Sequence, residues 1–308
     1  MTNVPQAFKR TSGSSLSRQG GIVSRRRELT EILFQGLFML SAFIGVLSLG
    51  LIGFFVFKEA APAIEFSGIG GLVAGTDWLP PALYGILPMI VASLLSTSLA
   101  VITGVPVGIM AAIFLAEVAP PLVVKIMRPA VELLAGIPSV VYGFFGLVVI
   151  VPLIEQVFGV PSGSTILAAS IVLAIMILPT VITVSETSLR AVPNQYKEGS
   201  LALGASKVYT TFFVQLPAAR SGILTGVILG IARAVGETMA IIMVMGNAPA
   251  MPEGVLDSAR SMTANIALEM SYATGIHSSA LYATGVVLLV FIMLLNATLM
   301  YLNRQTSK

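Results

Sequence analysis

The sequence contains no cysteine and one histidine, His277, among its 308 residues. Without cysteine the chain has no disulfide framework, no thiolate metal site and no thiol nucleophile. A single histidine also excludes a histidine-rich metal centre. These absences remove several classes of enzyme before any motif is considered.

Charged residues are scarce as well. Asp, Glu, Lys and Arg make up 10% of the residues and hydrophobic residues 56%, whereas about a quarter of a soluble domain is charged. Because so little polar surface cannot cover a globule in water, lipid is the expected solvent. The net charge of +3 does not indicate nucleic-acid binding, since the basic residues lie at the ends of apolar runs and form no stripe with interleaved aromatic residues.

Six apolar segments reach the length of about 20 residues that a membrane-spanning helix needs. The expected spans are about 31–57, 86–115, 129–151, 164–186, 221–246 and 280–302. Glu132, Gly136 and Pro138 interrupt the start of the third, which is tolerated where the break faces protein or a cavity. Alternating strands of about ten residues, the mark of a membrane β-barrel, are not seen. The sequence therefore predicts an all-α membrane protein, a bundle of six transmembrane helices within residues 31–308.

The positive charges predict the orientation of this bundle. With the N-terminus in the cytoplasm, 14 of the 17 Lys and Arg residues fall in cytoplasmic segments, while only Lys58 and Arg260 are external and Arg233 lies within the fifth span. Both termini are therefore expected inside. The apolar run after residue 30 is longer than the core of about 7–15 residues of a cleavable signal peptide, so it is expected to be a retained first span. The polar residues 1–30 before it are expected to be a mostly disordered cytoplasmic tail.

Two longer segments are expected on the external side. In residues 58–85, Trp78 suits an interfacial anchor and Pro80–Pro81 a rigid turn. In residues 247–279, the stretch from Met262 to Tyr272 has helical spacing. This stretch is either a short helix lying on the bundle or a contact surface for an external partner.

The segment 190–220, between the fourth and fifth spans, predicts two short helices joined by a glycine turn. Asn194 is the expected N-cap of the first helix, Gly204 the left-handed residue that ends it, and Ser206 the cap of the second, which Pro217 closes. Apolar side chains on such a hairpin need a partner or the bundle itself. These side chains are Leu201, Leu203, Phe212 and Phe213.

This segment resembles the coupling loop of ABC importer permeases, whose motif is E-A-A, three residues, G, nine residues and I-x-L-P. The full spacing is kept here, with small residues replacing the two alanines. The matching positions are Glu198, Gly199, Ser200, Gly204, Leu216 and Pro217. In that family the loop docks into a groove on a cytoplasmic ATPase subunit.

Three further stretches narrow the resemblance to phosphate permeases. Residues 232–240 are similar to the fifth-span signature of that family and residues 136–143 to its third-span signature. Residues 246–249, Gly-Asn-Ala-Pro, look like the PstC-type subunit rather than its PstA-type partner. The resemblance covers roughly residues 30–305.

Arg233 and Glu237 are charged residues inside the fifth expected span. Arg233 lies about 18 Å from the start of the span at ~1.5 Å per residue, where an ionised side chain costs at least ~2.5–3.5 kcal/mol. Their spacing of four puts both on one helix face. They either form a salt bridge that only orients the span, or Arg233 belongs to an anion path and Glu237 shields its charge. The guanidinium fork suits phosphate oxygens.

Three more residues are expected in this path: Thr238, Pro138 and Ser139. Pro138 and Ser139 either open the backbone so that its amides point at an anion, or Pro138 only kinks the helix. Glu132 is expected to pair with Arg128 on the surface, with Arg233 as an alternative partner.

The resemblance implies one permease subunit of an ABC importer that carries inorganic phosphate across a bacterial plasma (inner) membrane. The implied partners are a PstA-type permease, two cytoplasmic ATPase subunits and an extracytoplasmic phosphate-binding protein. No phosphate-cradling glycine loop followed by Lys and Ser or Thr is present, so ATP and Mg are expected on the ATPase subunits and no cofactor on this chain. Two alternatives stay open: an ABC permease for another oxyanion or small solute, and a membrane sensor or scaffold that signals phosphate status. A membrane-embedded enzyme is a weak third, because no acid/base or metal cluster is visible.

Overall fold

A computed structural model describes residues 16–306 of the chain. The chain divides into two units, residues 1–55 and 56–308, and each is described by itself. Helix α1, Leu16–Ala74, supplies the described part of the first unit and the start of the second. It begins inside the segment expected to be a tail, and residues 1–15 of that segment lie outside the described residues.

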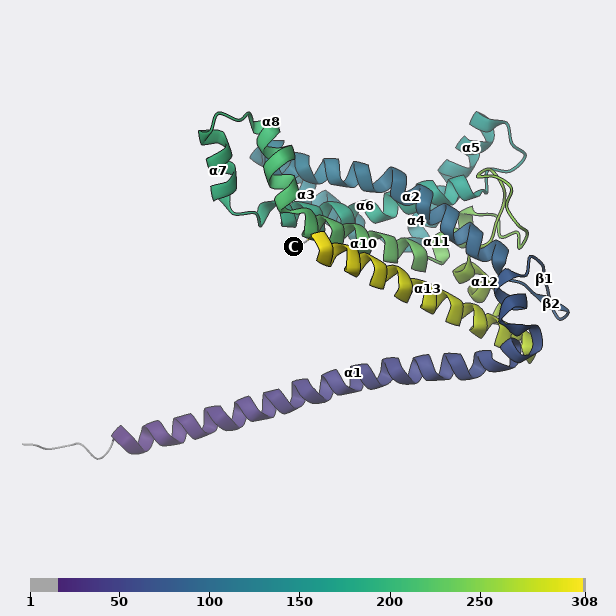
Figure 1. The fold of residues 1–308 in the computed structure, drawn as a ribbon, viewed down its shortest axis with the longest axis horizontal. Helices are drawn as coiled ribbons and strands as arrows, with labels where there is room; N and C mark the ends of the chain where they lie inside the picture. The colour runs from purple at the N-terminus through teal and green to yellow at the C-terminus, as the bar shows by residue number, and fades with distance from the viewer. Residues whose placement is uncertain (1–15, 307–308) are drawn as a thin grey trace, which may run out of the picture. The chain divides into compact units, whose positions relative to one another are not determined.

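The second unit continues beyond α1 with a small β-hairpin and a series of helices (Figure 1). The hairpin consists of β1, Trp78–Leu79, and β2, Leu83–Tyr84. The helices are α2 (Leu87–Ile113), α3 (Pro121–Gly136), α4 (Ser139–Phe145), α5 (Val151–Phe158), α6 (Ile166–Arg190), α7 (Asn194–Ala202), α8 (Lys207–Thr210), α9 (Leu216–Ala218), α10 (Arg220–Gly236), α11 (Met239–Val244), α12 (Met262–Glu269) and α13 (Ile276–Thr306). Three π-helical turns lie between them: η1 (Phe114–Val118), η2 (Gly146–Ile150) and η3 (Thr211–Gln215).

The described residues contain five helices that are long and apolar enough to cross a membrane, or six if one bent pair counts as a span. The five are Glu31–Ala74, Leu87–Val118, Ser139–Phe158, Ile166–Arg190 and Ile276–Thr298. The bent pair joins Lys207–Ala218 to Arg220–Gly236 at an angle of 70°. The predicted helical membrane bundle is thus confirmed, with the two-residue strands of the antiparallel β1–β2 hairpin as a small addition.

Helix α6 is the centre of the second unit, because α2, α3, α4, α10 and α11 all pack against it. Its side chains Leu173, Met176 and Ile177 are fully buried. A Cβ at Gly108 of α2 would lie 2.8 Å from the Val181 Cγ1 atom of α6. Glycine is therefore needed at this crossing, as is common where membrane helices approach closely.

Two of the expected spans contain breaks. Helix α3 ends at Gly136, Ile137 and Pro138 are extended, and a new helix starts at Ser139. Pro138 has no N–H group and disfavours helix at the residue before it, which explains the break. The third candidate span therefore begins at Ser139, ten residues beyond the expected start at 129. In the fifth expected span, α10 likewise ends at Gly236 and α11 resumes at Met239.

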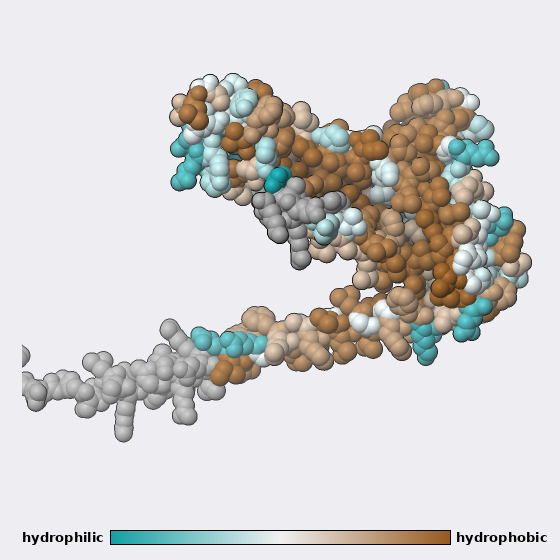
Figure 2. Space-filling view, in the orientation of Figure 1, coloured by the Kyte–Doolittle hydropathy of each residue, from teal (hydrophilic) through white to brown (hydrophobic). Residues whose placement is uncertain are grey.

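The surface of the second unit is divided by polarity. Figure 2 shows apolar side chains over its middle on the face drawn, while hydrophilic residues gather near α7 and α8 at one end and near the β-hairpin and α5 at the other. Large apolar residues such as Phe144, Val148 and Leu229 are exposed. An apolar belt with polar ends is the arrangement that a lipid bilayer requires.

Candidate functional site

The two helix breaks belong to one region, because the short helices that follow them lie side by side. Helices α4 and α11 pack together, and a Cβ at Gly143 would lie 2.8 Å from the Ala240 Cα atom and 2.9 Å from the Met243 sulfur. The absence of a side chain at Gly143 permits this contact. Since Ser139 and Met239 open these helices, the structure brings the Pro138–Ser139 segment near the Glu237–Thr238 segment.

Tyr142 holds the first break together. Its hydroxyl donates a 2.7 Å hydrogen bond to the carbonyl oxygen of Leu134 in α3, one of the carbonyls that a helix leaves unpaired at its C-terminus. Pro138 is exposed and Ser139 half-buried. The Tyr142 bond crosses the break, so the extended segment at residues 137–138 is fixed on both sides.

Glu237 holds the second break, and it does so without Arg233. Its Oε1 atom accepts a 3.1 Å hydrogen bond from the Ala240 N–H group at the start of α11. Its backbone carbonyl accepts a 2.7 Å bond from the Thr263 hydroxyl in α12. The Thr238 hydroxyl donates to the Gly236 carbonyl at 3.3 Å.

The expected placement of Arg233 and Glu237 on one helix face is wrong. Helix α10 ends at Gly236 and Glu237 is extended, with φ −69° and ψ 135°, so the two residues are not one helical turn apart. Within the described part of the chain, no salt bridge involves either residue. Arg233 is half-buried and lies in the last turn of α10, directly before the second break.

The coupling segment forms the expected helix, turn and helix. Gly204 has a positive φ of 86°, and the Ser206 hydroxyl oxygen accepts a 3.2 Å bond from the Tyr209 N–H group. Both predictions are confirmed. The prediction for Asn194 is wrong: the N-cap is Pro193, and Asn194 is already the first helical residue.

The segment from α7 to η3, called here the coupling hairpin, carries an open hollow of about 800 Å³. Glu198 and Gly199 are exposed on α7, and the side chain of Leu203 is 90% exposed. Tyr209 and Phe213 stack with ring centroids 4.8 Å apart. The residues that line the hollow are Gln195, Tyr196, Gly199, Ser200, Leu203, Gly204, Ala205, Ser206, Tyr209 and Val214. Exposed apolar surface on a polar end of the unit is a feature of a protein contact site.

The last two residues of the coupling motif lie where the hairpin turns into α10. Leu216 is half-buried and packs beside Leu189 and Ala219, whereas Pro217 is exposed. Pro217 also lines a hollow of about 770 Å³ with Tyr196 and Arg220.

Two glutamates that the sequence reasoning missed tie the coupling hairpin and α3 to the rest of the unit. Glu117 of η1 binds Lys197 of α7 and Gln215 of η3. Glu186 of α6 accepts from Arg128 of α3 and, at 2.9 Å, from Arg190.

The predicted ion pair between Arg128 and Glu132 is wrong, because Arg128 has a different partner. Arg128 pairs with Glu186, and Glu132 acts on Arg128 only through space. No signal in a single sequence identifies Glu186, which is 58 positions away from Arg128.

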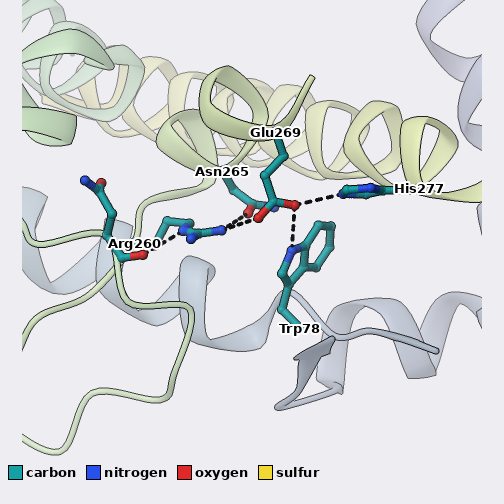
Figure 3. Close-up of polar contacts among 6 residues, drawn as sticks. Trp78, Arg260, Asn265, Glu269 and His277 are labelled. Atoms are coloured by element: carbon teal, nitrogen blue, oxygen red, sulfur yellow. Dashed lines mark hydrogen bonds and ion pairs between the residues drawn. The ribbon is translucent and has the colours of Figure 1, made fainter. Parts of the chain in front are cut away.

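At the opposite end of the unit, Glu269 is bound by side chains from β1, from α13 and from the segment between α11 and α12 (Figure 3). Its Oε2 atom accepts a 2.9 Å hydrogen bond from the Trp78 indole and lies 2.8 Å from the His277 Nε2 atom, and its Oε1 atom binds Arg260. Burial opposes the charge of Glu269, but hydrogen bonds from His277, Trp78 and Arg260 outweigh it and hold the pKa of this carboxyl below its usual value. The expected interfacial role of Trp78 is wrong, because its side chain is buried.

The Gly246–Asn247 pair connects this cluster to the second break. Both residues have positive φ, 89° and 64°, and the Asn247 side-chain amide donates to the Ile242 carbonyl at the end of α11. Arg260 in turn donates to the Asn247 carbonyl at 2.9 Å. Helix α12, the expected helical stretch, is packed against α13 and α2, with Met262 buried.

Residues 104–308 match the family model of the binding-protein-dependent transport system inner membrane component. The chain is 37% identical over 286 residues to the probable ABC transporter permease protein YqgH of Bacillus subtilis, covering 91% of this chain and 93% of that protein. The phosphate transport system permease protein PstC of Mesorhizobium japonicum is 32% identical, covering 90% of this chain and 91% of that protein. PstC of Pasteurella multocida is 37% identical, covering 69% and 72%.

Solved structures with a similar fold are also transporters. The MetNI methionine ABC transporter in an inward-facing conformation aligns with a TM-score of 0.55 at 18% identity, covering 73% of this chain and 95% of that chain. An amino acid ABC transporter aligns with a TM-score of 0.51 at 22% identity, covering 71% and 92%. At such identities the likeness shows the fold alone.

Proposed function

Because the chain belongs to the family of binding-protein-dependent transport system inner membrane components, we propose that its cargo is inorganic phosphate, carried into the cytoplasm. Membership makes the chain a multi-pass inner membrane protein and the permease subunit of an ABC importer. It has no ATPase domain and no cofactor of its own, since partner ATPase subunits hydrolyse ATP. A binding protein delivers the cargo in such systems.

The unpaired charge of Arg233 is the observation that supports phosphate as the cargo most directly. Its guanidinium has no ion-pair partner within the described part of the chain, although α10 belongs to the bent helix pair that forms the sixth candidate span. An unpaired charge at membrane depth is unfavourable unless it faces a bundle interior or a water-filled path. A planar guanidinium binds two oxygens of a phosphate at once, so a transient phosphate would supply the missing counter-charge.

The two helix breaks give the rest of the proposed path. Irregular backbone at membrane depth is tolerated where it lines a cavity, and broken helices commonly form transporter substrate sites. Pro138 and Ser139 lie at one break and Glu237 and Thr238 at the other. The Glu237 carboxylate accepts a hydrogen bond from the Ala240 N–H group at the start of α11. This bond partly offsets the negative charge of the carboxylate and so limits the repulsion between Glu237 and an anion in the path.

The coupling hairpin is the proposed contact with the ATPase. Three residues of the coupling motif lie on α7: Glu198, Gly199 and Ser200. Gly204 lies in the turn after α7, and Leu216 and Pro217 lie where the hairpin joins α10. ATP-driven motion of this hairpin would then reorient the bundle between outward and inward access. This role requires the hairpin and both termini to lie in the cytoplasm.

The proposed assembly pairs this chain with a PstA-type permease on two ATPase subunits. Support comes from the relatives that are named PstC phosphate permeases at 32–37% identity. The relative YqgH is named only as a probable ABC permease, and for this reason a different oxyanion or small solute is the competing candidate.

Uptake by the reconstituted complex tests the cargo. Proteoliposomes that hold the two permeases, the ATPase and the binding protein are expected to accumulate labelled phosphate with ATP, and a tenfold excess of sulfate is expected to leave uptake unchanged. Accumulation of a different solute with no phosphate uptake would contradict the proposal. Affinity purification of this chain from cells is a separate test of the assembly, in which a second permease and an ATPase are expected to copurify.

A further inference from the structure

The π-helical turn η1, at the end of α2, receives side chains from three later elements. The Arg190 guanidinium, at the end of α6, donates a 2.8 Å hydrogen bond to the Leu115 carbonyl. Lys197 of α7 and Gln215 of η3 both reach Glu117. Through these three contacts η1 joins the coupling hairpin to the membrane bundle.

Glu117 contacts both arms of the coupling hairpin with separate oxygens. The Lys197 Nζ atom lies 2.5 Å from its Oε2 atom, and the Gln215 Nε2 atom donates a 2.9 Å bond to its Oε1 atom. Its side chain is only 8% exposed, compared with 39% for Lys197. A buried carboxylate whose two oxygens are both engaged is held in a single position. The two arms therefore cannot separate from η1 without breaking these bonds.

The contacts of η1 lead onward to the proposed substrate path. The chain passes from η1 into α3, which ends directly at the break of residues 137–138. Helix α3 is also attached to α6 through Arg128 and Glu186. Motion of the coupling hairpin thus has a direct mechanical route, through Glu117 and α3, to Ser139.

We propose that Glu117 is a positioning residue that transmits movement of the coupling hairpin to the break at Pro138–Ser139. This inference rests on the proposed role of the hairpin as the ATPase contact, and it does not depend on the identity of the cargo. Glu117 acts by holding Lys197 of α7 and Gln215 of η3 against η1.

A thiol-labelling experiment on the complete complex tests this role. Because the chain has no cysteine, a Ser139→Cys substitution introduces a single reporter into it at the break, in a complex whose partner subunits are made cysteine-free. With Glu117 intact, trapping the ATPases with ATP and vanadate is expected to change the labelling rate of the reporter by a water-soluble maleimide. Glu117→Gln is expected to reduce that ATP-dependent change about tenfold, the effect of one lost charge-assisted hydrogen bond. Glu65→Gln is the matched control, because Glu65 is exposed and has no ion pair within the described residues.

Two further variants keep the test decisive. Lys197→Met removes the charged partner at a more exposed position, so it decides the question if Glu117→Gln prevents assembly. If Lys197 acts through Glu117, the ATP-dependent change in labelling rate is expected to be no smaller in the Glu117→Gln, Lys197→Met double variant than in Glu117→Gln alone. An ATP response that is as large in Glu117→Gln and Lys197→Met as in Glu65→Gln would overturn the proposal, as would a reporter that never responds. Failure of the unmodified complex to take up phosphate would contradict the proposed cargo. The ATP-dependent labelling of the Ser139→Cys reporter could still be measured, so the two proposals fail separately.

Discussion

Gly143 of α4 and Ala240 of α11 are in such close contact that a Cβ on Gly143 would lie 2.8 Å from the Ala240 Cα atom. This contact joins the two helix breaks into one region, although they lie about 100 positions apart in the sequence.

Replacement of Gly143 by alanine is expected to destabilise the bundle. The added methyl group would meet the Ala240 backbone, which cannot move aside as the Met243 side chain can, and overpacking of this kind typically costs about 1–3 kcal/mol. Gly136→Ala is the matched control, because a Cβ at Gly136 would meet nothing within 4 Å. Thermal unfolding of the purified protein in detergent is the measurement. Equal melting temperatures for the two variants would show that α4 and α11 are not packed as described.

The Glu269 cluster predicts a dependence of stability on acid. Since the folded pKa of Glu269 is depressed, the ionised carboxyl stabilises the fold above its ordinary pKa of 4.5, and this contribution is lost as the pH falls through the lower folded value. The groups that face Glu269 are Trp78, Arg260 and His277. Melting temperatures of the unmodified protein are therefore expected to fall with acidification through this window.

Glu269→Gln is the variant for this measurement. It removes the ionisable group and is expected to lower the melting temperature at neutral pH and to flatten the acid dependence below the ordinary pKa. Glu253→Gln, at an exposed position of the same long segment, serves as the control. Acid profiles of equal slope for the Glu269→Gln and unmodified proteins would contradict the role of this cluster.

Leu203 predicts the position of the ATPase contact. Its side chain is 90% exposed and lines the hollow of the coupling hairpin. Burial of a leucine in an interface contributes about 1.5–3 kcal/mol, so Leu203→Asp is expected to weaken ATPase binding at least about tenfold. Leu203→Met, which keeps an apolar side chain, is expected to bind normally. If both variants retain the ATPase equally well in a pull-down at graded concentrations, the hairpin does not dock through this hollow.

Much of the architecture was predictable because it depends on short-range patterns. The lengths of the apolar runs predict the spans, since the hydrocarbon core sets a minimum helix length. Gly204 and Ser206 predict the turn and cap of the coupling hairpin, since backbone conformation and capping are local. Pro138 signals the first break in the same local way.

The contacts that organise the candidate site were not predictable, because they join residues far apart in the sequence. Lys197 and Gln215 lie 80 and 98 positions from Glu117, and Trp78 lies 191 positions from Glu269. The assumption that Arg233 and Glu237 share a helix face failed for a different reason. Glu237 accepts a local hydrogen bond from the Ala240 N–H group at the start of α11, and the Thr263 hydroxyl, 26 positions away, donates to the Glu237 carbonyl, so one local and one tertiary contact hold Glu237 outside the helix.

Phosphate uptake by the complete complex that carries Arg233→Lys tests the central claim most directly. Lysine keeps the positive charge but loses the planar fork that binds two phosphate oxygens, so uptake is expected to fall at least about tenfold, the effect of one lost charge-assisted bond. Arg220→Lys, at an exposed position of the same helix, is expected to transport normally, which controls for the substitution itself. Normal phosphate uptake by the Arg233→Lys complex would contradict the claim that this guanidinium binds phosphate in the path.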